Sequence, residues 1–135
     1  PEEASEYVTA MKAEGIDRIF LISPTTTEER IKAISDVSGG FLYYVSLKGV
    51  TGAGHLDVNA VQDRVSTIRT LTELPVGVGF GIKDAESAAS IASATDAVVV
   101  GSAIVKRIEE NLDSADNAIK SVCELLSEMR QALDV

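Results

Sequence analysis

The amino-acid sequence predicts an α/β fold in which four parallel strands alternate with helices. Short apolar runs typical of buried strands alternate with segments of helical periodicity along the 135 residues. Strict alternation of this kind implies parallel pairing with right-handed crossovers. The composition agrees with this class, because 45% of the residues are apolar and only 4% are aromatic. The core is therefore aliphatic, as in parallel sheets that are covered on both faces.

The four strands are predicted from short apolar runs bounded by turn residues. The first run ends at Ser23-Pro24, the third opens after Pro75, and glycine follows the third and the fourth. The predicted strands are residues 18–24, 41–46, 76–80 and 97–100.

The helices are predicted from apolar stripes and from the polar residues at their starts. Thr25, Thr26 and Thr27 precede two glutamates and offer a hydroxyl cap. Asp57 or Asn59 can cap the next helix, and Asp84 is expected to be a cap rather than a catalytic base. Gly15 supplies the end of the first helix. The predicted helices cover residues 3–14, 28–37, 58–71, 85–94, 103–111 and 115–133. The stripe of the last helix consists of Ile119, Val122, Leu126, Met129 and Leu133, with Cys123 beside it as inert packing.

Two architectures fit four strand–helix units. One is an open doubly wound sheet, and the other is half of a (β/α)₈ barrel, whose full length is typically about 250 residues. A free half-barrel would leave two bare sheet edges, which are sites for pairing with another chain segment. Periodicity alone leaves both options open. The chain shows no linker and opens with Pro-Glu-Glu rather than Met, so we expect one domain that is a piece of something longer.

The charge balance argues against several partners. The formal net charge is −9, and a surface of that sign repels nucleic acids and anionic membranes. The single cysteine makes no intrachain disulfide, no apolar run approaches the roughly 20 residues of a membrane span, and no signal peptide is visible. We therefore expect a soluble cytoplasmic protein. His55 is the only histidine, so a metal site is not expected.

The carboxyl ends of the strands are the expected ligand edge. They carry glycine and hydroxyl residues, chiefly Gly52, Gly81 and Gly101-Ser102, and Lys48 is the only charged residue there before Asp84. Converging backbone N–H groups without Cβ atoms favour phosphate, especially at a helix start, and residues 103–111 can form the short extra helix of such a site. The alternative is that these glycines only form tight turns. In either case the edge lacks an acid–base pair.

Two further features of this edge remain open at this point. Thr51 and Gly52 lie in a long glycine-rich segment that is either a lid or a surface excursion. Tyr43 lies on the second strand next to Tyr44, and the pattern does not assign either ring to a face of the sheet.

Three motifs at these positions resemble the tryptophan synthase α-subunit family. They are Ser46-Leu47-Lys48-Gly49-Val50-Thr51-Gly52-Ala53, Gly79-Phe80-Gly81-Ile82 and Gly101-Ser102-Ala103-Ile104-Val105, in matching order and spacing. The resemblance extends from Pro1 through the last helix and implies the carboxyl-terminal half of a (β/α)₈, or TIM, barrel. It implies a lyase of tryptophan biosynthesis that cleaves indole-3-glycerol phosphate to indole and glyceraldehyde 3-phosphate.

The resemblance also assigns partners and roles. The implied partner is the β subunit of a heterotetramer, to which the pyridoxal phosphate belongs, so this chain is expected to hold no cofactor. Tyr43 would contact the substrate, and Thr51 would belong to the closing segment. The residues implied around the phosphate are Gly52, Phe80, Gly81, Gly101 and Ser102. The family's catalytic carboxylates belong to the amino-terminal half, so the piece is expected to be inactive alone.

Competing hypotheses stay open at the level of sequence. One is another phosphate-binding barrel of amino-acid biosynthesis, for which the Gly-Val-Thr-Gly-Ala run is not expected. The other is a half-barrel binding module that closes its sheet with a second copy of itself. For the proposed anion site, a bulkier residue at Gly81 or Gly101 is expected to abolish phosphate binding while barely changing the fold.

Overall fold

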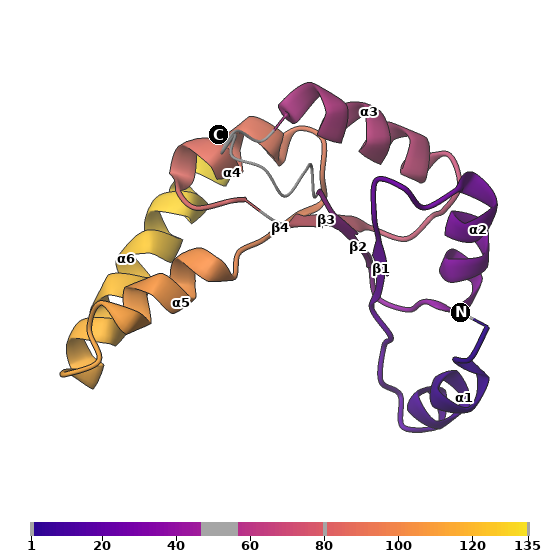
Figure 1. Ribbon diagram of the computed structural model, residues 1–135, viewed down its shortest axis with the longest axis horizontal. Coiled ribbons are helices and arrows are strands. Elements are labelled where there is room, and N and C mark those ends of the chain that lie inside the picture. The colour runs from indigo at the N-terminus through magenta and orange to yellow at the C-terminus, as the bar shows by residue number, and fades with distance from the viewer. Residues whose placement is uncertain (1, 47–56, 80, 135) are drawn as a thin grey trace.

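The computed structural model describes residues 2–46, 57–79 and 81–134 and contains the predicted parallel sheet. The strands are β1 (Phe20–Ile22), β2 (Leu42–Val45), β3 (Val76–Gly79) and β4 (Ala97–Val99). They pair in parallel in the order β1-β2-β3-β4, each next to its neighbour in sequence. Sequential pairing in one direction is barrel topology, because a doubly wound sheet reverses its strand order. Figure 1 shows the strands as a curved row.

The helices fall close to the predicted ranges. They are α1 (Ser5–Ala13), α2 (Glu28–Val37), α3 (Val58–Arg69), α4 (Ala85–Ala92), α5 (Ser102–Glu109) and α6 (Ala115–Leu133). Thr27, Asp57 and Asp84 accept hydrogen bonds from the first turns of α2, α3 and α4. The cap at Asp84 is thus confirmed, and Thr27 and Asp57 are the ones that cap among the candidates at the other two helices. Gly15 has φ of 67° after α1, which only glycine adopts without strain. Within the described ranges, no helix is long and apolar enough to cross a membrane.

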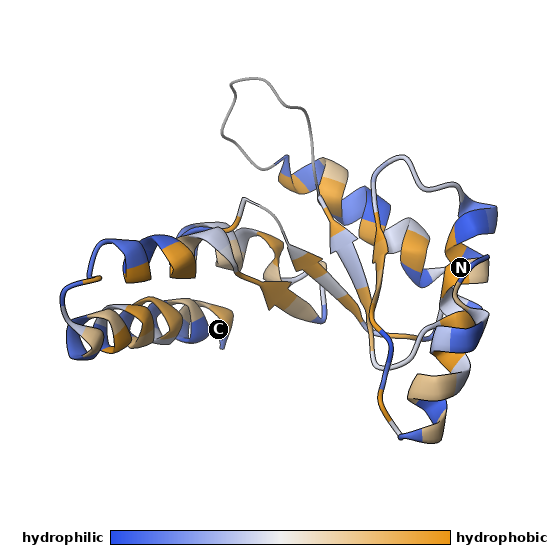
Figure 2. Cartoon of the chain, turned by 60° about the horizontal axis from the view of Figure 1, so that its bottom comes forward, coloured by the Kyte–Doolittle hydropathy of each residue, from blue (hydrophilic) through white to orange (hydrophobic). Residues whose placement is uncertain are grey.

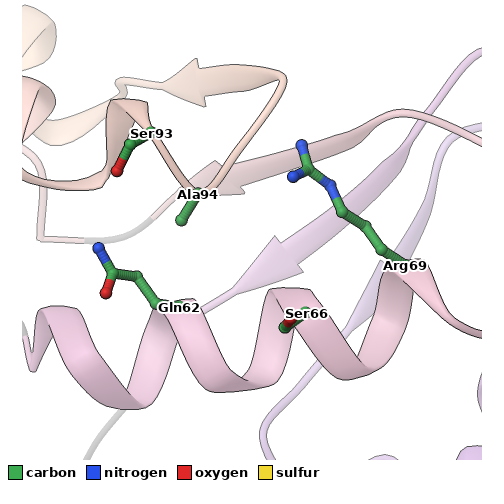
Figure 3. Close-up of a pocket in the computed structure, with 5 residues that line it drawn as sticks. All are labelled: Gln62, Ser66, Arg69, Ser93 and Ala94. Carbon is green, nitrogen blue, oxygen red and sulfur yellow. The ribbon is translucent and has the colours of Figure 1, made fainter.

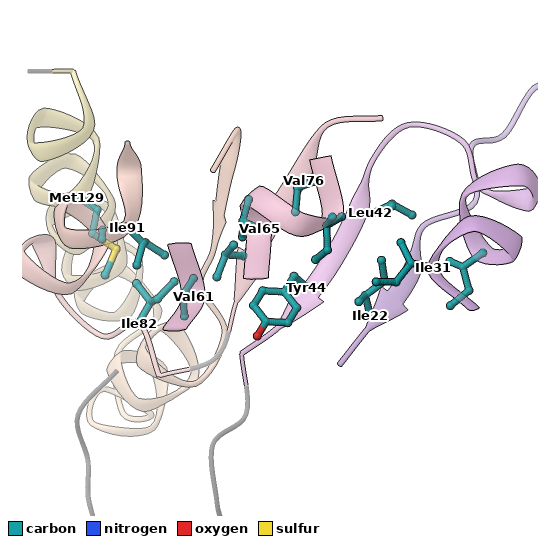
Figure 4. Packing of buried hydrophobic residues seen from close by; sticks show 14 of the residues in the cluster. Ile22, Ile31, Leu42, Tyr44, Val61, Val65, Val76, Ile82, Ile91 and Met129 are labelled. Atoms are coloured by element: carbon teal, nitrogen blue, oxygen red, sulfur yellow. The ribbon is translucent and has the colours of Figure 1, made fainter. Parts of the chain in front are cut away.

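The core lies between the sheet and helices α2, α3 and α4, which follow one side of the strand row (Figure 1). Along β2, Leu42 and Tyr44 point into this core, and their register partners Val76 and Val78 are fully buried beside them. In Figure 4, Leu42, Tyr44 and Val76 lie in one band with helix residues such as Val65, Val61 and Ile91. Figure 2 shows hydrophobic positions along the strands, with paler ones between them, whereas hydrophobic and hydrophilic residues alternate along the helices.

The opposite face of the sheet carries the alternate residues, because side chains in a strand alternate between faces. Leu21 is 60% exposed on this face, in register with Tyr43 and then with Gly77. Tyr43 is therefore the tyrosine on the face turned away from the helices, and Tyr44, 4% exposed, is the core tyrosine.

Two expectations for the apolar residues of α6 are wrong. Ile119 and Leu126 are 62% and 43% exposed, whereas Leu125 and Met129 are buried. Cys123 is exposed rather than packed. The reason is that α6 packs against both α4 and α5, so its buried face is turned relative to the stripe predicted from spacing alone.

The amino end of β3 is clamped by the residues that precede β4. The Val76 carbonyl accepts from the Asp96 N–H at 3.0 Å and from the Thr95 hydroxyl at 2.6 Å. The Asp96 carboxylate accepts from the Val76 N–H at 2.8 Å and from Arg69 at 2.9 Å. These bonds fix the register between β3 and β4 at the edge opposite the expected ligand edge.

Candidate functional site

Parallel pairing brings the carboxyl ends of all four strands to one edge of the sheet, where the predicted site residues lie. The structure describes four of them, Tyr43, Gly81, Gly101 and Ser102. Thr51, Gly52 and Phe80 fall outside the described residues, as do Lys48 and His55. Gly79 pairs with Val99 in the ladder, so Gly81 and Gly101 each stand two residues beyond a paired position. Neighbouring strands lie about 4.8 Å apart, which places both glycines in the same part of the edge.

Tyr43 lies across Gly79 on the face turned away from the helices. A Cβ built on Gly79 would lie 2.5 Å from Cε2 and 2.7 Å from Cζ of the tyrosine ring. Real Cβ atoms essentially never come this close, so the ring occupies the space that a side chain would need. Gly77 has a similar relation to Phe41, whose Cε2 would lie 3.0 Å from the added carbon. The alternating glycines of β3 therefore make room for aromatic rings from the β2 segment.

Ser46 adds a second contact to Gly79, and the sequence reasoning assigned it no role. Its backbone N–H and its hydroxyl both donate to the Gly79 carbonyl, at 3.1 Å and 3.0 Å. The residue is only 8% exposed. A serine directly after an apolar strand was the available signal, but serines are common at strand ends, and only the pairing of β2 with β3 shows its target.

Gly81 forms the turn that leaves β3. Its φ is 79°, in the left-handed region, and no atom that the structure describes lies within 4 Å of a Cβ placed on it. The residue is exposed. Its backbone conformation needs glycine, and the space beside it is open.

Gly101 begins helix α5 in the same part of the edge. It is exposed, and a Cβ placed on it would meet no described atom within 4 Å. No side-chain hydrogen bond caps this helix, in contrast to α2, α3, α4 and α6. The first amides of α5 therefore carry the positive end of the helix dipole without a carboxylate or hydroxyl cap, so far as the described residues go.

Two aspartates near this edge, Asp57 and Asp84, are engaged in helix capping. Asp84 forms a capping box with Ser87, whose N–H donates to the carboxylate at 2.9 Å. Hydrogen bonds from the Ser87 hydroxyl and then from its backbone lower the pKa of Asp84. Asp57 accepts from the Ala60 N–H at 3.1 Å. Neither carboxylate is arranged as a proton-transferring base, which agrees with the cap assigned to Asp84 from sequence.

A polar groove lies elsewhere, between α3 and the residues that follow α4 (Figure 3). It is lined by Gln62, Ser66, Arg69, Ser93 and Ala94. The groove runs along α3 from Gln62 to Arg69 and reaches the end of α4. It is thus separate from the glycine-rich edge. Among the described residues, no three His, Cys, Asp or Glu side chains are grouped in a way that could hold a metal ion.

The fold defines a class: four sequential βα units of a parallel (β/α)₈ barrel. The comparisons specify the family within that class. The chain belongs to the tryptophan synthase alpha chain family, whose model matches residues 1–134. The family suggested by the three sequence motifs is confirmed.

Curated relatives and solved structures agree on this family. The chain is 54% identical to the tryptophan synthase alpha chain of Thioalkalivibrio sulfidiphilus and 55% identical to that of Nitrosococcus oceani, covering 99% of its own length in both. It superposes on the tryptophan synthase subunit alpha of Legionella pneumophila with a TM-score of 0.84 at 36% identity, covering 99% of this chain and 48% of that one. For a tryptophan synthase structure from Mycobacterium tuberculosis the TM-score is 0.83 at 35% identity, covering 100% and 49%.

The chain spans about half the length of the curated relatives it matches, 50% and 49% for the two named above. The matched part is their carboxyl-terminal half. These findings favour neither a different phosphate-binding barrel nor a self-associating module.

Proposed function

We propose that this chain forms the phosphate-binding half of a barrel that cleaves indole-3-glycerol phosphate to indole and glyceraldehyde 3-phosphate. Membership of the tryptophan synthase alpha chain family supports this activity and its place in tryptophan biosynthesis. In this proposal residues 1–135 are the carboxyl-terminal half of one barrel domain in the cytoplasm. The complementary half would cover the open face of the sheet, where Leu21 is 60% exposed.

One observation carries the proposal: Gly81 and the start of α5 follow neighbouring strands, and no described side chain caps that helix start. A phosphate needs several N–H donors and no Cβ atoms in its way. The open turn at Gly81 and the open helix start at Gly101 meet both needs on neighbouring strands. Ser102, at the first helical position, is exposed and adds a hydroxyl donor.

The remaining substrate-binding roles are carried over by motif. Tyr43 would contact the substrate from the open face of the sheet, where its ring already lies over Gly79. Gly52 and Phe80 would complete the phosphate surroundings, and Thr51 would belong to the closing segment.

Cleavage breaks a carbon–carbon bond, and its proton transfers need a positioned acid and base. Asp57 and Asp84, near the described edge, are caps. We propose that the catalytic carboxylates come from the complementary half, as the family resemblance implies, and that this chain alone is inactive. The partner would be the β subunit of a heterotetramer, which holds the pyridoxal phosphate and receives indole. The matched Mycobacterium tuberculosis structures are of tryptophan synthase, which is consistent with such a partner.

The test uses a completed barrel, which we define as the amino-terminal half of the Thioalkalivibrio relative fused to this chain. Calorimetry measures the binding of glycerol 3-phosphate, and indole release from indole-3-glycerol phosphate measures activity. Gly101→Val is expected to weaken glycerol-phosphate binding at least tenfold with little loss of stability, because the protein leaves room for the side chain where the anion would lie.

Ala115→Val is the matched control, since it adds bulk at the exposed first residue of another helix, α6, beyond the far end of α5. Unchanged affinity in Gly101→Val contradicts the phosphate site. Indole release by the isolated 135-residue chain contradicts the need for the other half.

A further inference from the structure

We propose that Ser46 is a positioning residue that holds the Gly79 carbonyl, and with it the carboxyl end of β3, in the geometry that binds the anion. This inference rests on the phosphate site proposed above and deepens it. Ser46 itself would not touch the phosphate. Its hydroxyl would act through the carbonyl of Gly79.

The geometry shows a carbonyl held by two donors of one residue. The Ser46 N–H donates to the Gly79 oxygen at 3.1 Å and continues the ladder between β2 and β3. The Ser46 hydroxyl donates to the same oxygen at 3.0 Å, inside a residue that is 8% exposed. A ladder bond alone leaves the carbonyl a broad range of directions, whereas a second donor narrows that range.

The direction of this carbonyl determines the path of the backbone beyond β3. The peptide group is planar, so fixing the Gly79 oxygen fixes the plane in which the backbone leaves the strand. Gly81, at φ of 79°, lies two residues further and contributes to the proposed site. On the other face, the Tyr43 ring limits movement of Gly79. Tyr43 lies in β2 and Ser46 directly follows that strand, so both contacts to Gly79 come from one short segment.

The other end of β3 supplies a natural control. There the Val76 carbonyl also accepts one N–H, from Asp96 at 3.0 Å, and one hydroxyl, from Thr95 at 2.6 Å. Removing either hydroxyl takes one donor away from a carbonyl of β3, and at Thr95 it also removes the contact at 3.0 Å with the Ala97 carbonyl. Only the one at Ser46 lies at the proposed phosphate edge. A purely structural role would make the two substitutions equivalent.

The experiment compares Ser46→Ala, Ser46→Thr and Thr95→Val in the completed barrel. Calorimetry with glycerol 3-phosphate is expected to show about tenfold weaker binding for Ser46→Ala, because binding must then order a carbonyl that the serine holds in place beforehand. Ser46→Thr, which retains the hydroxyl, and Thr95→Val are expected to stay within twofold of the unmodified barrel. In the indole-release assay, Ser46→Ala is expected to raise KM with kcat nearly unchanged, because phosphate contacts act on substrate and transition state alike.

The outcomes separate the two proposals. Equal affinity for Ser46→Ala and the unmodified barrel overturns the role of Ser46 alone. Equal losses in Ser46→Ala and Thr95→Val also overturn it, since the effect would then be general destabilisation. If the unmodified barrel binds no glycerol 3-phosphate, the phosphate site and this inference both fall. Should the alanine variant not fold, Ser46→Cys keeps most of the volume with only a weak donor and takes its place, with the same tenfold expectation.

Discussion

The contact between Tyr43 and Gly79 predicts that the smallest possible side chain at Gly79 destabilises the protein. In Gly79→Ala the new Cβ would lie 2.5 Å from Cε2 and 2.7 Å from Cζ of the ring. Gly79 is buried in a strand paired on both sides, so its backbone has little freedom to retreat. The hydroxyl oxygen of Tyr43 is the atom nearest to the new Cβ, and the rigid ring would have to move together with it.

The expected magnitude is the difference between two effects. Overpacking of this kind costs about 1–3 kcal/mol. Replacing glycine by alanine restricts the unfolded chain and returns about 0.4–1 kcal/mol. The free energy of unfolding should therefore fall by about 1–2 kcal/mol. At Gly77 the added carbon would lie 3.0 Å and 3.1 Å from two atoms of the half-buried Phe41 ring, so a shift of a few tenths of an ångström suffices. Gly77→Ala should be close to neutral.

A double-mutant cycle isolates the contact. Urea unfolding of the completed barrel, followed by circular dichroism, is measured for Gly79→Ala, Tyr43→Leu and the pair. Leucine lacks the ring atoms that clash, so Gly79→Ala should be neutral or mildly stabilising in that background. The double variant should be about 1–3 kcal/mol more stable than the sum of the two single effects predicts, which is within the range measured for residues in contact. Additive effects, or an equal loss in Gly77→Ala, would refute the reasoning.

Three further predictions concern helix ends and the clamp on β3. Asp84→Ala removes the capping box with Ser87 and should lower the free energy of unfolding by about 0.5–2 kcal/mol in urea titrations, with Asp84→Asn losing less. Asp96→Asn should also destabilise, and its effect should vanish at low pH. The Val76 N–H, and less strongly Arg69, lower the pKa of Asp96 in the folded state, so its contribution is present above the unfolded pKa of about 4 and is lost as the pH falls through the folded value. A constant loss from pH 7 to pH 3 would contradict this cause. Arg18→Met should lower the free energy of unfolding by about 1 kcal/mol, because the guanidinium donates to carbonyls at the end of α2. Thermal unfolding of Arg18→Lys then shows whether a positive charge alone is enough.

The elements of the fold could be predicted from sequence because their signals are local. Caps such as Thr27 and Asp57 act within one turn, and apolar runs record burial within one strand. The choice between an open sheet and a barrel needed more, because it depends on which strands are neighbours. That choice came from three motifs in register and from the observed strand order.

The errors arose where burial depends on tertiary partners. The spacing in α6 permits several apolar stripes, and contacts with α4 and α5 select the one that contains Leu125 instead of Leu126. The faces of Tyr43 and Tyr44 were undecidable for the same reason. At the site, glycines were visible in the sequence, but their separate reasons were not: Gly79 needs room for a ring, and Gly81 needs a positive φ. The expectation that a bulkier residue at Gly81 barely changes the fold is therefore wrong, since any side chain there strains the backbone, whereas Gly101 leaves space for one.

The acidic surface is compatible with the proposed anion site, because short-range dipoles outweigh distant charge. The net charge of −9 is spread over the surface, and exposed charges are largely screened beyond about 8 Å at physiological salt. The nearby carboxylates of Asp57 and Asp84 already accept amide hydrogen bonds at their own helix starts. Helix α5 begins with glycine and without a side-chain cap among the described residues, so its amides keep their capacity for an anion. Gly101→Asp would give this helix an acidic cap and should therefore weaken glycerol-phosphate binding. Gly101→Asn adds nearly the same bulk without the charge and should weaken binding less. Calorimetry of the two variants separates the effect of charge from that of bulk.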